Sequence, residues 1–293
     1  MKRLNIITAL FLGMSTSATF AQASLLNAKT ASEIGEKTLE EIVLDTEGPR
    51  PYEHVNERDI LWQKKVWEVI PADQKANMKY FFPLDKVHGR KPLFDILMDG
   101  VMSGAISEVY DDDTFTHKLN LEELKSKLTR TVITDEGIDQ MNLGLPVSEE
   151  YIDVYKLRAR DVKEYKIMGL WYFDRNEGEL KYRILGICPV TVDLATRGLE
   201  QENMQDLFWI FFPGARDILY KHYAYNERNE RSKVSYDQLF NQRRFNATIY
   251  KVDNAYGDYA ISDLVQDNAM RQLIEAERVK QEIREFEDDL WNY

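Results

Sequence analysis

Three closely spaced runs of β-forming residues within 161–216 constrain this chain more than any other feature. The first two runs, 165–173 and 179–187, flank a polar connection that ends in Gly178. A short polar connection with a glycine available for positive φ is typical of a β-hairpin. The third run, 207–212, is apolar at every position, as in a strand that is buried on both faces. A sheet built from these runs is therefore the expected centre of the fold.

Before these runs the sequence shows patterns that we interpret as helices. Ile60 and Lys64 begin a helical spacing that continues at Trp67 and Ile70, so we predict a helix there. A second helix is predicted over 148–157, because apolar residues recur there at similar intervals.

Two capping patterns and a long charged segment complete the helical signals. Asn120 and Glu123 have the spacing of a capping box, and so do Ser235 and Gln238. Residues 262–291 form one long charged helical pattern. The sequence as a whole predicts an α+β fold, with a mixed sheet, flanking helices and a long C-terminal helix.

Residues 1–23 have the pattern of a signal peptide. Lys2 and Arg3 form a positive start, an apolar run too short to cross a bilayer follows, and small residues end at Ala21 or Ala23. The leader contains no cysteine, so we expect no lipoprotein attachment site. The mature chain is therefore expected outside the inner membrane.

Two further boundaries follow from composition. Residues 24–58 are polar and contain the stiff break Gly48-Pro49-Arg50-Pro51, so we predict an extended N-terminal arm. Whether this arm wraps a neighbour or is a disordered tail stays open. Residues 59–293 are predicted to form a single α+β domain that ends in the helix at 262–291.

The charge balance limits the classes of partner. The net charge is −12, and the predicted leader carries only positive charges. This balance argues against nucleic acid and against docking on anionic lipid, and it favours a basic protein partner. Cys188 is the only cysteine, so no internal disulfide can form, and its apolar surroundings predict a buried small side chain. No later apolar run is long enough for a transmembrane helix.

No recognisable catalytic constellation is present, so we assign no catalytic, cofactor-binding or metal-binding residues. The triplet 111–113 is all aspartate but lacks the spacing of a calcium loop, and a solvated turn is the better interpretation. The four histidines share no metal-ligand spacing, and no nucleophile elbow or phosphate loop occurs. Separated carboxylates that meet in space would still permit a periplasmic carboxylate-dependent hydrolase. A monomeric ligand-binding protein is a further alternative.

The end of the chain is the candidate partner interface. Apolar residues recur at intervals of three and four in a heptad-like seam, and acids and aromatic residues follow. A terminal helix folded onto its own domain is the open alternative. If the seam binds a partner, removing residues 282–293 should weaken binding and leave the core folded. The candidate residues are Val279, Ile283, Phe286, Asp288, Asp289, Leu290, Trp291 and Tyr293.

Several separate blocks, in order, resemble the GldN family of gliding-motility proteins, called PorN where the system serves only secretion. No single block is specific, but together they span most of the mature chain, and a signal peptide without a lipoprotein cysteine also fits. The blocks are Trp62 with VW at 66–67, YDD at 110–112, DVKEY at 161–165, WYFD at 171–174, RILGICP at 183–189, LFWIFFP at 207–213, SYDQLF at 235–240 and EDDLW at 287–291.

The resemblance implies a non-enzymatic, periplasmic structural subunit of the type IX secretion and gliding machinery. Such a protein forms a ring with a GldK/PorK-type outer-membrane lipoprotein and couples to the GldL–GldM motor through a GldM/PorM-type protein. It would be associated with the outer membrane through that partner, without a membrane span of its own. The family pattern contains no catalytic residues, so none are transferred.

Overall fold

The predicted hairpin is the centre of the structure. In the computed structural model β5 (Val162–Asp174) and β6 (Glu179–Val192) pair antiparallel over most of their length. Gly178 closes the turn with a φ of 68°, in the left-handed region that glycine tolerates, and its N–H donates to the carbonyl of Asp174 at 2.8 Å. The hairpin prediction is thus confirmed, with strands longer than the runs that indicated them.

The structure describes residues 48–87, 89–144, 146, 148–193, 196, 203–226, 233–255, 257–266 and 268–291. All of these belong to the unit Glu47–Tyr293. The predicted signal peptide and residues 24–47 of the predicted arm lie outside them, and the domain boundaries stay predictions.

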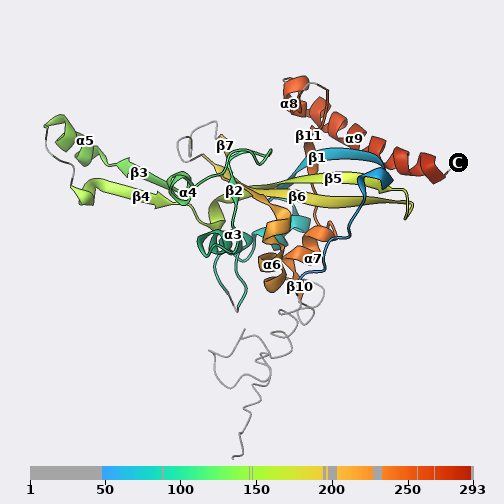
Figure 1. Cartoon of the computed structure of the whole chain (residues 1–293). Helices are drawn as coiled ribbons and strands as arrows, with labels where there is room; N and C mark the ends of the chain where they lie inside the picture. Colours follow the sequence, from blue (N-terminus) through green and yellow to red (C-terminus); the bar gives the residue numbers. More distant parts are fainter. Residues whose placement is uncertain are drawn as a thin grey trace, which may run out of the picture. The chain divides into compact units, whose positions relative to one another are not determined.

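Seven strands form one sheet in the order β11-β1-β5-β6-β8-β2, with β7 paired to β6, and each described strand pair is antiparallel (Figure 1). Two small sheets, β9–β10 and β3–β4, are separate from it. The other strands are β1 (Ile60–Pro71), β2 (Val109–Tyr110), β3 (Thr129–Ile133), β4 (Ile152–Lys156), β7 (Met204–Asp206), β8 (Trp209–Phe211), β9 (Tyr223–Ala224), β10 (Val234–Ser235) and β11 (Thr248–Val252).

Helices flank this sheet, and the last of them is the longest, so the predicted α+β class is confirmed. The α-helices are α2 (Met78–Phe81), α3 (Leu93–Met102), α4 (Leu121–Leu128), α5 (Asp135–Asn142), α6 (Phe212–Lys221), α7 (Tyr236–Asn241), α8 (Ile261–Leu264) and α9 (Ala269–Trp291). Short 3-10 turns are η2 (Glu57–Asp59), η3 (Lys75–Asn77), η4 (Glu149–Tyr151) and η5 (Ala159–Asp161). Among these residues no helix has the length and apolar character needed to cross a bilayer.

The capping predictions are confirmed at two helix starts. The side chain of Asn120 accepts from the backbone N–H of Glu123 at 2.9 Å, and the Glu123 carboxylate accepts from the N–H of Asn120 at 3.0 Å. At α7 the Ser235 hydroxyl accepts from the N–H of Gln238 at 3.2 Å. Both caps satisfy N–H groups that the first helical turn leaves without partners.

Two predicted helices are wrong, and the predicted single helix over 262–291 is divided, because α8 ends at Leu264 and α9 begins at Ala269. The segment from Ile60 is the strand β1, and most of 148–157 is the short turn η4 followed by β4. In β1, alternate residues from Trp62 to Ile70 lie on one face, as strand geometry requires. Lys64 and Glu68 lie on that face together with the apolar residues. Because these two are charged, the sequence does not show the alternation of apolar and polar residues that indicates a strand.

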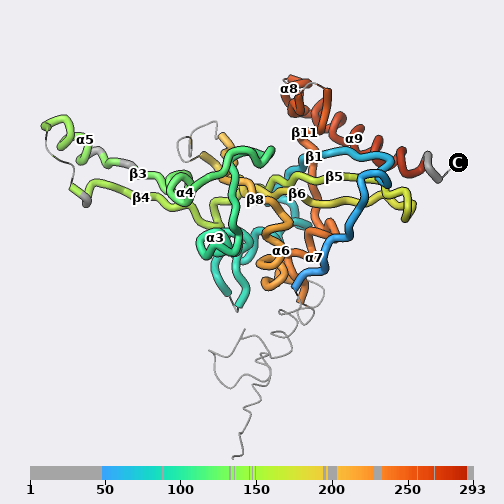
Figure 2. Tube along the Cα trace, viewed as in Figure 1, coloured from blue at the N-terminus to red at the C-terminus, as the bar shows by residue number. Residues whose placement is uncertain are grey.

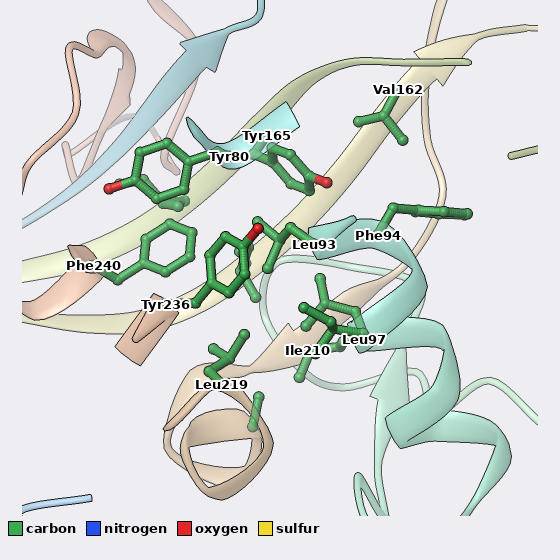
Figure 3. Close-up of a cluster of buried hydrophobic side chains, with 14 of the residues drawn as sticks. Tyr80, Leu93, Phe94, Leu97, Val162, Tyr165, Ile210, Leu219, Tyr236 and Phe240 are labelled. Atoms are coloured by element: carbon green, nitrogen blue, oxygen red, sulfur yellow. The ribbon is translucent and has the colours of Figure 1, made fainter. Parts of the chain in front are cut away.

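The main core lies between the sheet and helices α3, α6 and α7. Figure 3 shows Tyr80, Tyr236 and Phe240 among the side chains of this cluster, with Leu93 and Leu97 contributed by α3. The rings of Tyr80 and Phe240 are 4.8 Å apart. A second cluster packs α9 on β1 and β11, and a third surrounds Trp67. The side chains in these three clusters are buried, so only the residues outside them are available to bind a partner or ligand.

Candidate functional site

The most elaborate polar arrangement in the described residues joins the buried Glu68 to Arg243 and Tyr182, which are half-buried. Glu68 is 1% exposed, and its carboxylate accepts two hydrogen bonds from the Arg243 guanidinium, at 2.8 and 2.9 Å. The Tyr182 hydroxyl donates a third, at 2.9 Å. Burial raises the pKa of Tyr182, and the neighbouring Glu68 carboxylate adds to this effect. The phenol therefore stays protonated and can donate to the carboxylate.

Backbone geometry makes this group possible. The Arg243 guanidinium lies 3.9 Å from the centre of the Tyr182 ring, and Arg243 itself has a φ of 48°, which is uncommon for a residue with a side chain. Tyr182 crosses over Gly169 on the neighbouring strand, where a Cβ atom would lie 2.1 Å from the phenol oxygen. Glycine is therefore required at 169 for the ring to reach Glu68 on β1.

This group has the properties of a structural ion pair. A bidentate arginine neutralises the carboxylate, and all three members are already bound to one another, so none is left to attack a substrate or move a proton. It ties β1, β6 and the segment after α7 together at the point where two hydrophobic clusters meet. Its chemistry positions elements and does not indicate an active site.

Among the described residues, the other carboxylates whose pKa is raised do not line either of two surface cavities. Burial raises the pKa of Asp95 and Glu164. It also raises that of Asp253, which shares a hydrogen bond with Asp258 in an exposed turn. One surface cavity of about 460 Å³ is lined by Glu57 and by β1 residues from Ile60 to Gln63. A second, of about 210 Å³, lies between β11 and α9 and has no acidic lining.

The three aspartates of 111–113 each bind different groups of the protein. Asp111 pairs with Lys127, and Asp113 pairs with Lys251 at 2.5 Å. Asp112 accepts from the hydroxyl groups of Thr114 and Thr116 and from two backbone N–H groups. Their carboxylates thus stabilise a turn instead of converging on one point. In the described part of the chain no three His, Cys, Asp or Glu side chains are grouped to hold a metal ion.

Three of the predicted interface residues pack against their own domain. Val279 and Ile283 are buried with Val66 of β1, and the Phe286 ring stacks on Trp62 with centroids 4.7 Å apart. The inner seam of α9 thus follows the alternative of a helix folded onto its own sheet. Truncation at residue 282 would therefore remove core side chains, contrary to the expectation that the core stays folded.

The last turn of α9 stays a prediction as an interface. Asp288 is exposed at this end of the helix. The side chains of Asp289, Leu290 and Trp291, and the whole of Tyr293, lie outside what the structure describes. Binding of a partner by these residues is accordingly untested.

The segment before β1 is anchored to two helices. The Tyr52 hydroxyl donates to Asn241 at 2.9 Å, and its ring lies 4.0 Å from the guanidinium of Arg216. Arg216 in turn donates to Asp237 at 2.8 Å in a buried ion pair between α6 and α7. Burial raises the pKa of Tyr52 to about 12, which keeps its hydroxyl protonated. Tyr52 therefore holds the segment 48–58 against helices α6 and α7.

An exposed arm is the feature that the sequence analysis missed. Among the described strands, β3 and β4 pair only with each other, and α5 and η4 lie between them. We call residues 129–156 the hairpin arm (Figure 1). Leu143 is 76% exposed and Val154 is 64% exposed. Ile138, Met141 and Tyr155 are exposed as well. Val154 and Tyr155 are neighbours on β4, so they point to opposite faces of the arm, and both faces are uncovered.

The base of the arm is fixed in the main core. The N–H of Leu157 donates to the carbonyl of Leu128 at 2.9 Å, and both side chains are buried. A two-stranded hairpin is only marginally stable by itself, and uncovered apolar side chains on it mark a contact surface. The adjacent apolar pair at 154–155 is the only sequence signal that could have indicated it.

Comparisons with known proteins give one family. No curated protein matches the chain. The family model described as gliding motility associated protein GldN matches residues 55–292, a range that contains the seven-stranded sheet, the hairpin arm and α9. Since this match covers most of the chain, the protein belongs to the GldN family of gliding motility associated proteins.

Proposed function

We propose that this protein is a non-enzymatic structural subunit of the type IX secretion and gliding machinery. In this proposal it acts in the periplasm and forms a ring with a GldK/PorK-type outer-membrane lipoprotein. It then transmits force from the GldL–GldM motor through a GldM/PorM-type protein. Membership of the GldN family and the predicted signal peptide support this assignment.

The hairpin arm is the observation that carries the proposal. Exposed patches of large apolar side chains on soluble proteins mark sites of association, because covering them removes apolar area from water. Leu143, Val154 and Tyr155 present such area on a segment that the core does not need. A protein that works by assembly has a use for this arm, whereas a monomeric enzyme or ligand-binding protein does not.

The pairing of polar groups among the described residues also supports a non-enzymatic role. Glu68 and Arg243 neutralise each other inside the fold, and Asp111 and Asp113 are paired with lysines. Neither described cavity is lined by two carboxylates, which a hydrolase of the carboxylate type would need. Force transmission by a rigid subunit requires no reacting group, and it benefits from buried ion pairs that lock the orientation of elements.

The arm can be removed without cutting into the core. Thr129 pairs with Lys156 at its base, so replacing residues 130–155 by Asn-Gly should close a two-residue hairpin. We expect the shortened protein to fold with an unchanged unfolding temperature and to lose the large assembly. The assay is a pull-down of the tagged protein from its own envelope, followed by size-exclusion mass analysis.

A milder variant tests whether the apolar side chains of the arm, as distinct from its backbone, are needed for assembly. Val154→Ser with Tyr155→Ser keeps the arm but removes two exposed apolar groups, and it should weaken assembly in the same direction. The exposed pair Leu61→Ser and Gln63→Ser on β1 is the matched control and should leave assembly unchanged. A wild-type protein that elutes as a monomer without a partner, or an assembly of unchanged size without the arm, contradicts the proposal.

A further inference from the structure

An acidic chain carries one locally basic and apolar loop. Residues 82–92, between α2 and α3, are called the finger loop here, and Figure 2 shows the loop projecting beyond α3. The loop contains Lys86, Arg90 and Lys91 and a single acid, Asp85, although the chain as a whole has a net charge of −12. Phe82, Leu84 and Val87 of the loop are 47%, 39% and 41% exposed.

Neighbouring groups leave this loop positive. Asp85, its one acid, lies 3.5 Å from Arg160, so that charge is balanced. Lys91 is likewise paired with Asp99, at 2.6 Å, so Lys86 and Arg90 are the cations that remain in the loop. Lys86 is exposed and makes no ion pair with any carboxylate in the part of the chain that the structure describes. Arg90 lies 5.0 Å from the ring of Tyr225, a contact that retains the positive charge and adds an exposed aromatic ring beside the loop.

The net charge of −12, which by itself argues against docking on anionic lipid, does not cancel the positive potential at this loop. The screening length at physiological ionic strength is about 8 Å, so charges on distant elements are largely screened at the tip of the loop. A surface that approaches the loop therefore meets cations and apolar side chains together. That combination is the one by which peripheral proteins hold an anionic membrane surface.

We propose that the finger loop docks on the surface of an anionic phospholipid bilayer. Phe82, Leu84 and Val87 would enter the headgroup region, while Lys86 and Arg90 would contact lipid phosphates. The loop is a projection, and both described cavities lie elsewhere, at β1 and between β11 and α9. A projecting tip suits insertion into a bilayer better than capture of a peptide, which needs a groove. This inference goes beyond the ring proposal and does not depend on the hairpin arm.

The test is flotation of the purified full-length mature protein with vesicles. Vesicles of phosphatidylethanolamine with phosphatidylglycerol should bind it, and phosphatidylcholine vesicles should not. Lys86→Glu should weaken binding about thirtyfold, since losing a basic residue near an anionic surface costs about 1 kcal/mol and the new negative charge costs about as much again. Leu84→Ser with Val87→Ser should weaken it comparably. Lys125→Glu and Leu121→Ser change exposed residues of α4 in the same way and should bind as the wild type does.

Three results would overturn the proposal. The first is absence of the wild-type protein from the anionic vesicle fraction. The second is a loss of binding in Lys125→Glu as large as that in Lys86→Glu, which would indicate a non-specific effect of net charge. The third is a finger variant that loses a protein partner from the envelope but keeps the vesicle binding of the wild type, which would assign the loop to an acidic protein surface. Assembly size, measured on the same variants, reports on the ring proposal separately.

Discussion

Gly169→Ala tests the central polar group most directly. The new Cβ would lie 2.1 Å from the Tyr182 hydroxyl oxygen and 2.2 Å from the ring carbon that carries it. Tyr182 cannot retreat easily, because its ring is stacked under Arg243 at 3.9 Å and its hydroxyl is bound to Glu68. The substitution must therefore displace the ring or the strand.

The expected loss of stability can be worked out from these contacts. Overpacking of a closed site costs about 1–3 kcal/mol. Losing a hydrogen bond to a carboxylate costs about 1.5–3 kcal/mol. Replacing glycine within a strand recovers about 0.5–1 kcal/mol. The sum is a net destabilisation of about 3 kcal/mol, which corresponds to a fall in unfolding temperature of about 9 °C for a chain of this size.

The assay is urea or thermal unfolding of Gly169→Ala in two backgrounds. In the wild-type background the full loss is expected. In a Tyr182→Ala background the clash is gone, so Gly169→Ala should be neutral or slightly stabilising. The coupling free energy between the two sites should thus be about 3 kcal/mol in magnitude. Equal losses in both backgrounds would show that Tyr182 is not the reason for glycine at 169.

Three further outcomes are expected. Arg243→Met leaves the buried Glu68 carboxylate unpaired and should lower the free energy of unfolding by about 3–5 kcal/mol, and adding Glu68→Gln should restore most of it; no recovery in urea titrations would refute the pairing. Burial raises the pKa of Glu164, so the folded state binds its proton more tightly, and stability should fall as pH rises through the raised pKa. Glu164→Gln should lack that fall, which unfolding midpoints across the weakly acidic range can check. Truncation after Gln281 should unfold the α9 region, whereas truncation after Glu287 should not, as far-UV circular dichroism would report; equal effects would contradict the packing of Ile283.

Local signals made the central hairpin predictable. Two β-forming runs and a glycine turn lie within a short stretch, so both partners of the pairing are visible together in the sequence. The caps of α4 and α7 are also local, since each joins residues three positions apart. These features need no knowledge of distant contacts.

Strand β1 was misread because its partners are distant in sequence. Lys64 pairs with Glu282, and Glu68 pairs with Arg243. Without those partners two charged residues cannot be assigned to a buried face, and the remaining spacing of Ile60, Lys64, Trp67 and Ile70 imitates a helix. The central polar group escaped prediction for the same reason, because three strands and a loop contribute to it.

The packing of α9 limits how this chain can meet a partner. Freeing its inner seam would expose Val279, Ile283 and Phe286, and each apolar side chain returned to water costs about 1.5–3 kcal/mol. It would also break the ion pair between Lys64 and Glu282. A partner that used this seam would have to supply all of that free energy before it gained any affinity. Contacts through surfaces that are already exposed carry no such penalty. Assembly should therefore use the hairpin arm, with the outer face of α9, where Met270 and Ile274 are exposed, as the secondary surface.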